Sequence, residues 1–147
     1  MIIGIGLDLV EIERVRGMLE RHPSRARAKL FTPGEVDHCG RVREPVESFA
    51  ARFAAKEALF KALGTGLSGG ARWCDVEVVV MDSGAPMLRL HGPTLRIAEE
   101  LGVTRAHVSL THTRHLASAY VVLEGEPAEA VSPFHTGQPR PKRSKAS

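Results

Sequence analysis

One segment of the chain combines the residue types that bind a phosphorylated molecule. Lysine and arginine side chains meet phosphate oxygens, and glycines let the backbone approach them. A carboxylate among them would repel the anion unless a divalent cation bridges the two. One predicted helix and the loop after it carry these residue types together: Arg52, Lys56, Glu57, Lys61 and Gly64-Thr65-Gly66. The pattern indicates a metal-assisted site for a phosphorylated ligand.

Asp8 is a second carboxylate in an unusual place. It follows a run of small and apolar residues at the end of a predicted strand, where a charged side chain needs a partner. Magnesium prefers oxygen ligands and usually combines one or two carboxylates with substrate phosphates and waters. Asp8 and Glu57 are therefore candidate magnesium ligands. The alternative is that Asp8 only caps the helix predicted after it.

The charged residues of the helix also have ordinary alternatives. Glu57 and Lys61 stand four residues apart and could form a surface pair worth only about 0.3 kcal/mol. Lys56 projects into the middle of an apolar stripe, where a lysine either extends to water or meets a buried anion. The stripe consists of Phe49, Phe53, Phe60 and Leu63. From the residues alone, these alternatives stay open.

A mixed set of strands and helices must position these residues. Apolar and β-branched runs predict strands over 2–9, 76–81, 87–91, 106–112 and 117–124. Helical spacing predicts helices over 11–22, 45–63 and 93–101. A further short helix should begin at Thr32-Pro33-Gly34-Glu35, a capping box with proline at the first helical position. This order predicts an α+β fold, in which an antiparallel sheet built from hairpins packs with helices.

The composition is that of a single soluble domain. The chain has 147 residues, of which 43% are hydrophobic and 25% are charged, and this suits one core. We expect the domain to span residues 1–124, and the Pro-, Ser- and Lys-rich residues 125–147 to form a disordered basic tail. No stretch is long enough to cross a membrane, and residues 1–7 lack the layout of a signal peptide. We therefore expect a cytoplasmic protein whose cysteines, Cys39 and Cys74, are reduced.

The positive charge is not distributed as in a nucleic-acid-binding protein. The net charge is +3, of which residues 125–147 supply +2 and residues 1–124 only +1. With one Trp and one Tyr, the domain also lacks aromatic platforms for bases. One stretch is strongly basic, with Glu20 as its single acid, and contains Arg14, Arg16, Arg21, Arg25, Arg27 and Lys29. Such a patch suits an acidic protein partner, or is an ordinary solvated helix face.

Two stretches resemble the signatures of the holo-acyl-carrier-protein synthases, small members of the 4'-phosphopantetheinyl transferase superfamily. Residues 6–15, GLDLVEIERV, are similar to the first signature, and residues 49–66 are similar to the second. The second stretch contains the run Arg-Phe-Ala-Ala-Lys-Glu-Ala and ends in Lys-Ala-Leu-Gly-Thr-Gly. Supporting matches lie at residues 30–35, 84–86 and 108–113. The resemblance covers residues 1–124 and leaves the tail outside.

The resemblance implies the fold of this superfamily and a role for each candidate residue. Asp8 and Glu57 would hold Mg²⁺ together with the diphosphate of coenzyme A. The donor's phosphates would meet Arg52, Lys56 and Lys61, its nucleotide would lie against Gly64, Thr65 and Gly66, and its adenosine end would lie near Ser83, Pro86 and His112. Position 83 departs from the family pattern, which has asparagine there more often, so the contact of Ser83 is the least supported.

The resemblance also implies partners and a reaction. Arg14 and Met18, with Arg21 beside them, would dock an acidic acyl carrier protein, and the chain would form a homotrimer with sites between subunits. The enzyme would transfer the 4'-phosphopantetheine group of coenzyme A to a carrier serine and release adenosine 3',5'-bisphosphate. Lys56 and Lys61 would stabilise the charge on the bridging oxygen. Glu57 would take the serine proton directly, or orient a metal-bound water that takes it.

A different class of function remains as the alternative. A non-catalytic module that binds coenzyme A or a nucleotide, and so regulates carrier-protein metabolism, needs the same phosphate-binding residues. Such a module would bind the donor without turnover.

Overall fold

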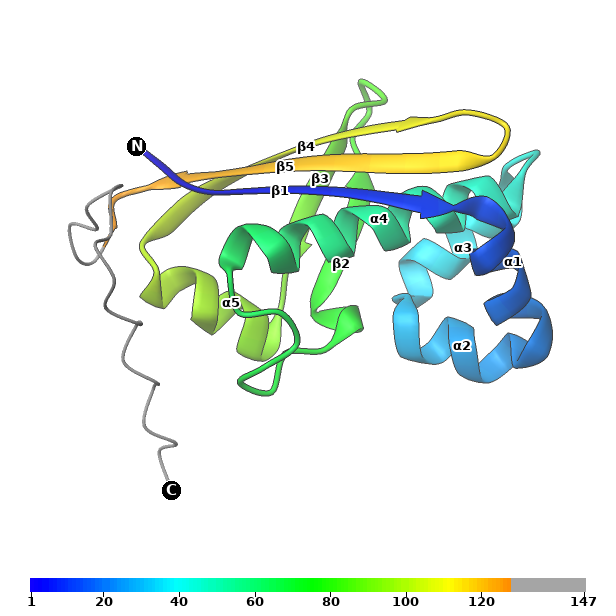
Figure 1. The fold of residues 1–147 in the computed structure, drawn as a ribbon, viewed down its shortest axis with the longest axis horizontal. Coiled ribbons are helices and arrows are strands. Elements are labelled where there is room, and N and C mark those ends of the chain that lie inside the picture. Colours follow the sequence, from blue (N-terminus) through cyan, green and yellow to red (C-terminus); the bar gives the residue numbers. More distant parts are fainter. Residues whose placement is uncertain (128–147) are drawn as a thin grey trace.

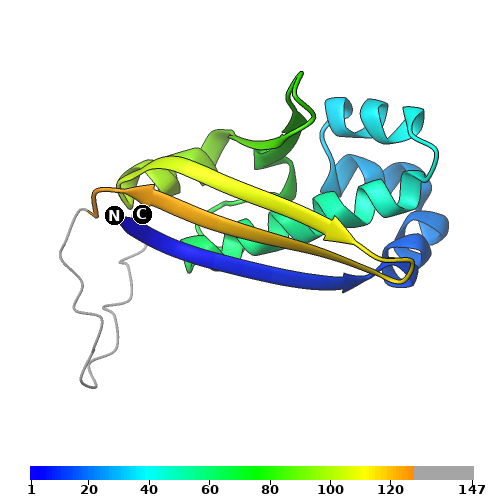
Figure 2. The same cartoon turned by 90° about the horizontal axis from the view of Figure 1, so that it is seen from above.

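A long helix lies across one face of a three-stranded antiparallel sheet in the computed structural model, which describes residues 1–127 (Figure 1). The helix is α4 (Pro45–Leu63), and the strands are β1 (Ile2–Glu11), β5 (Leu116–Gly125) and β4 (Val103–His112), in that order across the sheet. Seen from above, the three strands run side by side over the helix (Figure 2). The predicted α+β fold with an antiparallel sheet is confirmed.

Small residues allow α4 to lie directly against β1. A Cβ added at Gly6 would lie 1.7 Å from the carbonyl oxygen of Ala58, and one added at Gly4 would lie 2.0 Å from that of Ala62. Any larger residue at either position would push the strand away from the helix. The glycines of the first signature therefore fix how close the strand that carries Asp8 comes to the helix.

The aromatic stripe of α4 faces away from the sheet. Phe60 follows Ala58 by two positions, which turns it by about 200° around the helix. Phe53 and Phe60 pack against Trp73, with ring centroids 5.3 and 5.5 Å apart. Because α4 is buried both on this face and on its alanine face, it is the central element of the core.

Three short helices cluster at the N-terminal end of α4 (Figure 1). They are α1 (Ile12–Arg21), α2 (Pro23–Leu30) and α3 (Pro33–Arg41). The predicted capping box opens α3: Thr32 Oγ1 accepts a hydrogen bond from the Glu35 amide, and Glu35 Oε1 accepts one from the Thr32 amide. Helix α2 was not predicted, since only Leu30 of its residues is buried and its sequence shows no apolar periodicity.

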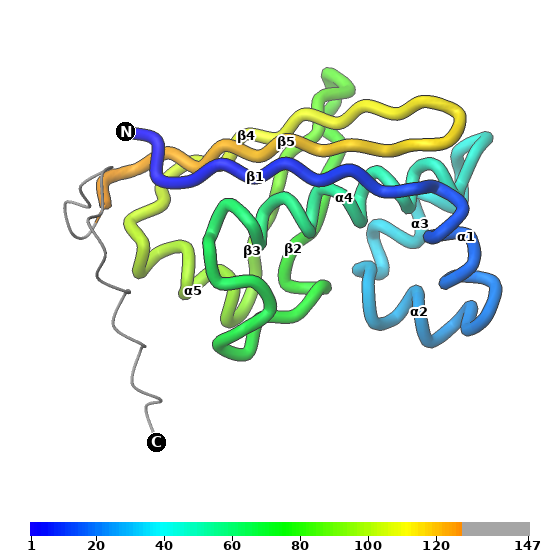
Figure 3. The backbone as a smooth tube through the Cα atoms, in the orientation of Figure 1, coloured from blue at the N-terminus to red at the C-terminus, as the bar shows by residue number. Residues whose placement is uncertain are grey.

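A two-stranded hairpin stands beside the sheet. It consists of β2 (Val76–Val80) and β3 (Pro86–Leu90), follows a short 3₁₀ turn η1 (Trp73–Asp75), and is followed by α5 (Gly92–Glu100). The backbone trace shows that the turn of the hairpin projects beyond the sheet on the side of β4 (Figure 3), and β3 contacts β4. The hairpin and β4 therefore meet at an angle, and the space between them is bounded by both.

The predicted element boundaries differ from the structure mainly at strand ends. β1 continues two residues past the predicted end, and β4 begins three residues earlier than predicted, at Val103. The predicted disordered tail falls mostly on residues 128–147, which lie outside the described residues. Across residues 1–127, every helix is too short or too polar to cross a lipid bilayer.

Candidate functional site

Asp8 and Lys61 are in contact where β1 crosses α4. Lys61 Nζ lies 3.0 Å from Asp8 Oδ1 and 3.0 Å from the carbonyl oxygen of Leu7. Gly6 and Val10, which alternate with Asp8 along the strand, are buried. The alternation therefore turns Asp8 toward the helix. Its side chain stays 14% exposed, and because β1 is an edge strand, a ligand can reach the carboxylate from the open side.

Glu57 lies close enough to Asp8 for the two carboxylates to influence each other. Burial raises the pKa of Glu57, and the charge of Asp8 raises it further, whereas Lys61 and Arg14 lower it. Two candidate metal ligands and one candidate phosphate contact therefore lie together, with Arg14 of α1 nearby. We call Asp8, Glu57 and Lys61 the carboxylate cluster.

The carboxylate cluster offers a metal ion two acidic side chains. Within residues 1–127, no group of three or more His, Cys, Asp or Glu side chains could hold a metal ion. A hard cation that bound at this point would complete its coordination from ligand phosphates and water, which is the usual habit of magnesium.

Lys56 lies apart from the carboxylate cluster, inside the protein. Its side chain is fully buried, and its Nζ lies 2.5 Å from Glu35 Oε1 and 3.2 Å from the carbonyl oxygen of Trp73. Burial lowers the pKa of Lys56, and the Glu35 carboxylate opposes this effect. The lysine does not extend to water: the buried anion that it meets is Glu35. A contact with a phosphate would require Lys56 to leave this position.

Arg52 and Pro86 line a cleft of about 320 Å³ in the angle between the β2–β3 hairpin and β4. Arg52 is 4% exposed, and one terminal guanidinium nitrogen donates to Ser48 Oγ at 2.7 Å. The other residues that line the cleft are His38, Val78, Val80, Gly84, Val108, Ser109 and Leu110. Apolar walls around a buried guanidinium suit a ligand with a flat apolar part and a negative charge.

Two buried side-chain polar atoms in residues 1–127 lack a hydrogen-bond partner. They are Nε of Arg52 and Oγ1 of Thr65. A buried donor or acceptor without a partner costs about 1–3 kcal/mol, so such atoms indicate a missing partner. Both atoms belong to residues that the family resemblance assigns to coenzyme A.

The remaining candidate residues lie at the ends of three elements. Gly64 ends α4 in the left-handed region, with φ 72°, and Gly66 in the next loop has φ 57°, so both positions favour glycine. Ser83 accepts a hydrogen bond from a backbone amide within the hairpin turn. His112, at the end of β4, lies 3.3 Å from a carboxylate oxygen of Glu47.

The candidate donor-binding residues do not form one site within a single chain. Glu57 follows Arg52 by five positions, which separates their directions around α4 by about 140°. The carboxylate cluster accordingly lies on the β1 side of the helix, and the Arg52 cleft lies on the β4 side. The residue types of the helix alone had grouped them on one surface, whereas the family resemblance implied sites between subunits.

The predicted docking residues share one face of α1. Arg14 and Arg21 are exposed, and Met18 is half-buried. Their spacing of four and three residues places them on the same side of a helix. Since Arg14 also lowers the pKa of Glu57, this face borders the carboxylate cluster.

Two residues of functional interest were not found by sequence reasoning. His38 lines the Arg52 cleft, and nothing in its sequence neighbourhood distinguishes it. Glu35 was recognised only as a capping residue, although its carboxylate also binds Lys56 and the Val78 amide. The need of Lys56 for a buried anion was the available signal, but it did not identify which acid would supply the charge.

Comparison with known proteins identifies the family of the chain. The family model described as the 4'-phosphopantetheinyl transferase superfamily matches residues 4–121. A holo-[acyl-carrier-protein] synthase of Solibacter usitatus is 46% identical over 124 residues, which cover 84% of this chain and 99% of the relative. That of Methylobacterium radiotolerans is 50% identical over 131 residues, which cover 86% of this chain and 96% of the relative.

Solved structures of similar proteins share the fold. The holo-[acyl-carrier-protein] synthase of Neisseria meningitidis superposes with a TM-score of 0.78 at 33% identity, covering 84% of this chain and 99% of the other. The synthase of Bacillus anthracis in complex with CoA (3',5'-ADP) gives a TM-score of 0.70 at 33% identity, with coverage of 86% and 99%. The chain belongs to the 4'-phosphopantetheinyl transferase superfamily and, within it, to the holo-[acyl-carrier-protein] synthases.

Proposed function

We propose that this chain transfers the 4'-phosphopantetheine group of coenzyme A to a serine of an apo-acyl carrier protein. Membership of the synthase family supports the activity, and the complex of the Bacillus anthracis relative with CoA supports the donor. The observation that carries the proposal is the convergence of Asp8, Glu57 and Lys61 at an accessible edge of the sheet. Two carboxylates can bind a divalent cation, and the ammonium of Lys61 can bind a phosphate oxygen. This combination suits a diphosphate that binds together with a cation.

Lys61, Arg52 and Thr65 are the proposed contacts of the donor. Lys61 Nζ, half-exposed, can donate to a phosphate oxygen while it stays near Asp8. The unpartnered Nε of Arg52 and Oγ1 of Thr65 supply two further polar contacts. Gly64, Gly66, Ser83, Pro86 and His112 remain proposed neighbours of the nucleotide. Lys56 is left out of this set because its side chain is fully buried.

Asp8 and Glu57 are the proposed magnesium ligands, and their chemistry fits the ion. Both supply carboxylate oxygens, and the charge of Asp8 disfavours the ionised form of Glu57, so a divalent cation between them relieves the repulsion. When bound, magnesium neutralises the charge of the donor's diphosphate.

The chain's own residues align the reactants and move the proton. The serine oxygen forms a bond with the β-phosphorus of coenzyme A, and the bond from that phosphorus to the bridging oxygen breaks. The electron pair stays on the bridging oxygen, which leaves with adenosine 3',5'-bisphosphate. Lys61 is placed to stabilise the charge that grows on the diphosphate. Glu57 is the proposed acceptor of the serine proton, directly or through an ordered water.

A homotrimer with sites between subunits accounts for two features of the single chain. First, the carboxylate cluster and the Arg52 cleft lie on opposite sides of α4, so two copies can each supply one half of a donor site. Second, the outer face of the sheet carries a row of exposed apolar side chains: Ile5, Leu7, Leu9 and Tyr120. A continuous apolar face of this kind suits association with further copies.

The carrier protein is the proposed partner of α1. Arg14 and Arg21 present positive charge to an acidic surface, and Met18 adds an apolar contact between them. Because Arg14 also acts on Glu57, a carrier bound there would hold its serine near the carboxylate cluster. We place the reaction in the cytoplasm, where the unpaired thiols of Cys39 and Cys74 would stay reduced.

The test is intact-mass analysis of an apo-acyl carrier protein incubated with this chain, coenzyme A and Mg²⁺. The carrier should gain the mass of one phosphopantetheine group, and EDTA should prevent the gain. A carrier that keeps its mass while calorimetry shows that coenzyme A binds would favour the non-catalytic module instead.

A further inference from the structure

A buried ion pair connects three elements inside the protein, apart from the carboxylate cluster. Lys56 of α4 and Glu35 of α3 are both fully buried, with 2.5 Å between Nζ and Oε1. The ammonium also donates to the carbonyl oxygen of Trp73, and it lies 5.3 Å from the centroid of the Phe31 ring. Besides the Glu35 carboxylate, a backbone carbonyl and an aromatic ring thus contact the Lys56 ammonium, and Cys74 and Glu77 lie near enough to influence its charge.

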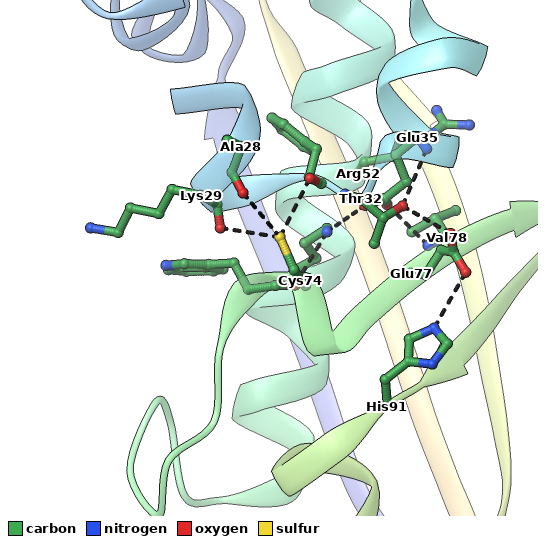
Figure 4. Close-up of polar contacts among 12 residues, drawn as sticks. Ala28, Lys29, Thr32, Glu35, Arg52, Cys74, Glu77, Val78 and His91 are labelled. Atoms are coloured by element: carbon green, nitrogen blue, oxygen red, sulfur yellow. Dashed lines mark hydrogen bonds and ion pairs between the residues drawn. The ribbon is translucent and has the colours of Figure 1, made fainter. Parts of the chain in front are cut away.

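The carboxylate of Glu35 is fully used by its neighbours. Oε1 accepts hydrogen bonds from the Thr32 amide at 3.0 Å and from Lys56, and Oε2 accepts one from the Val78 amide at 3.0 Å. Figure 4 shows Glu35 between Thr32, at the start of α3, and Val78, on β2. The carboxylate therefore joins α3, α4 and the hairpin at one point.

The position of Lys56 determines where Glu57 points. The two residues are neighbours on α4, so their side chains leave the helix about 100° apart. The ion pair with Glu35 restrains the rotation of α4 about its axis, together with the packing of Phe53 and Phe60 against Trp73, and so directs Glu57 to the β1 side. Gly4 and Gly6 fix the distance between the same helix and β1. The ion pair adds a hydrogen-bonded, directional restraint to these contacts.

Stability alone does not account for a charged pair at this place. Apolar side chains of similar size are often equal to or better than a buried ion pair in their effect on stability. A salt bridge whose carboxylate also accepts two amides allows only one orientation of its partners, whereas an apolar contact tolerates several.

We propose that Glu35 and Lys56 are positioning residues for phosphopantetheine transfer, which orient α4 so that Glu57 and Lys61 meet Asp8. The inference rests on the proposed function, and it gives the lysine of the Lys-Glu run a role without donor contact. Lys56 touches neither the donor nor the reacting atoms, and it acts through the residue that follows it.

The test compares the variants Lys56→Met, Glu35→Gln and the double variant that carries both. For each, kcat and KM for coenzyme A are measured per folded molecule, at a temperature where circular dichroism shows an intact fold. The matched control is Arg41→Met, which removes an exposed ion pair with Asp37 on the same helix as Glu35. A misplaced catalytic group costs on the order of 100-fold in rate.

Positioning predicts that Lys56→Met lowers kcat about 100-fold and leaves KM for coenzyme A nearly unchanged. Glu35→Gln should lower kcat to a similar extent, and the double variant should be no worse than either single variant, because all three lack the same ion pair. A direct phosphate contact predicts a different result: KM for coenzyme A rises in Lys56→Met and in the double variant, whereas Glu35→Gln stays near the wild type. That result would overturn the proposal. If Lys56→Met does not fold, Glu35→Gln and the double variant give the same comparison.

A binding measurement separates this proposal from the proposed function. The affinity of the chain for Mn²⁺ in the presence of coenzyme A is followed by electron paramagnetic resonance. Positioning predicts weaker Mn²⁺ binding in Lys56→Met, in Glu35→Gln and in the double variant, whether or not any carrier is modified. Mn²⁺ affinities equal to that of the wild type in all three variants would refute the positioning role. A wild-type chain that binds Mn²⁺ but modifies no carrier would refute only the proposed function.

Discussion

Gly6 of β1 lies so close to Ala58 of α4 that a Cβ at Gly6 would be 1.7 Å from the carbonyl oxygen of Ala58. Two residues further along the same face of the strand, Asp8 meets Lys61, one turn further along the helix. The close approach of the two backbones is what brings the carboxylate within reach of the ammonium. The small residues of both signatures therefore act together with the charged ones.

The variant Gly6→Ala tests this dependence. The methyl group cannot be accommodated against backbone, so we expect a loss of at least about 3 kcal/mol of folding free energy. Urea denaturation would measure it. The control is Gly40→Ala on α3, where nothing lies within 4 Å of the added Cβ. A gain of up to about 1 kcal/mol is expected there. Equal stability of the two variants would show that β1 is not held at this distance.

Removing the charge of Asp8 should stop transfer without unfolding the protein. Asp8→Asn keeps the shape of the side chain but removes the charge that faces Lys61 and Glu57. We expect kcat to fall at least about 100-fold, and higher Mg²⁺ concentrations to be needed for half-maximal activity. Asp37→Asn, which removes a surface charge paired with Arg41, is the control. Activity near that of the control would remove Asp8 from the metal site.

Local sequence patterns determine the ends of the helices that carry the site. The capping box at Thr32 and the glycine at position 64 specify where α3 begins and where α4 ends, and both were predictable, since each depends on a few neighbouring residues. The same holds for the direction of Asp8, which follows from strand alternation. These features need no information from distant parts of the chain.

Tertiary contacts decided what could not be predicted. The partner of Lys56 comes from 21 positions earlier in the chain, and no local pattern distinguishes Glu35 from the other acids. Only Leu30 of the eight residues of α2 is buried. The helix therefore needs no apolar face, and its sequence carries no apolar periodicity from which it could be predicted. The angle between Arg52 and Glu57 around α4 follows from helix geometry. Which strand each of them faces could not be predicted, because that depends on where β1 and β4 lie.

Arg14 should contribute to carrier binding more than to chemistry. It is exposed on α1, and its loss removes a charge from the docking face, so Arg14→Ala should raise KM for the carrier about fivefold, which corresponds to about 1 kcal/mol. The remaining KM should depend less on salt, because one ionic contact fewer is screened. Arg96→Ala on α5, at the opposite end of the molecule (Figure 1), makes the same charge change. If both variants have the same KM, α1 is not the docking face.

The outer face of the sheet should hold the copies of the chain together. Leu7 is 58% exposed in the single chain, and Leu7→Glu would place a charge in the middle of the apolar row. Light scattering should show a trimer for the wild type and a monomer for the variant, with loss of activity because the donor site needs two copies. Leu95→Glu on α5 is the control for a charge on an exposed leucine. A monomeric wild type that is fully active would contradict this arrangement.

His38 should make the protein less stable in acid. Burial lowers the pKa of His38, the charges of Arg52 and Arg41 lower it further, and Asp37 opposes them. Because the folded pKa lies below the unfolded value of about 6.5, the unfolded chain binds more protons as the pH falls below that value, and the free energy of unfolding decreases. Well above pH 7 the residue is neutral in both states and has no such effect.

In His38→Gln, the loss of stability between about pH 7.5 and pH 5 should be smaller than in the wild type. Urea denaturation at a series of pH values would measure it. Adenosine 3',5'-bisphosphate should reduce the acid sensitivity of the wild type, since an anion in the Arg52 cleft favours the protonated imidazole. If the stability of His38→Gln depends on pH as that of the wild type does, then burial and the Arg52 guanidinium do not lower the pKa of this imidazole.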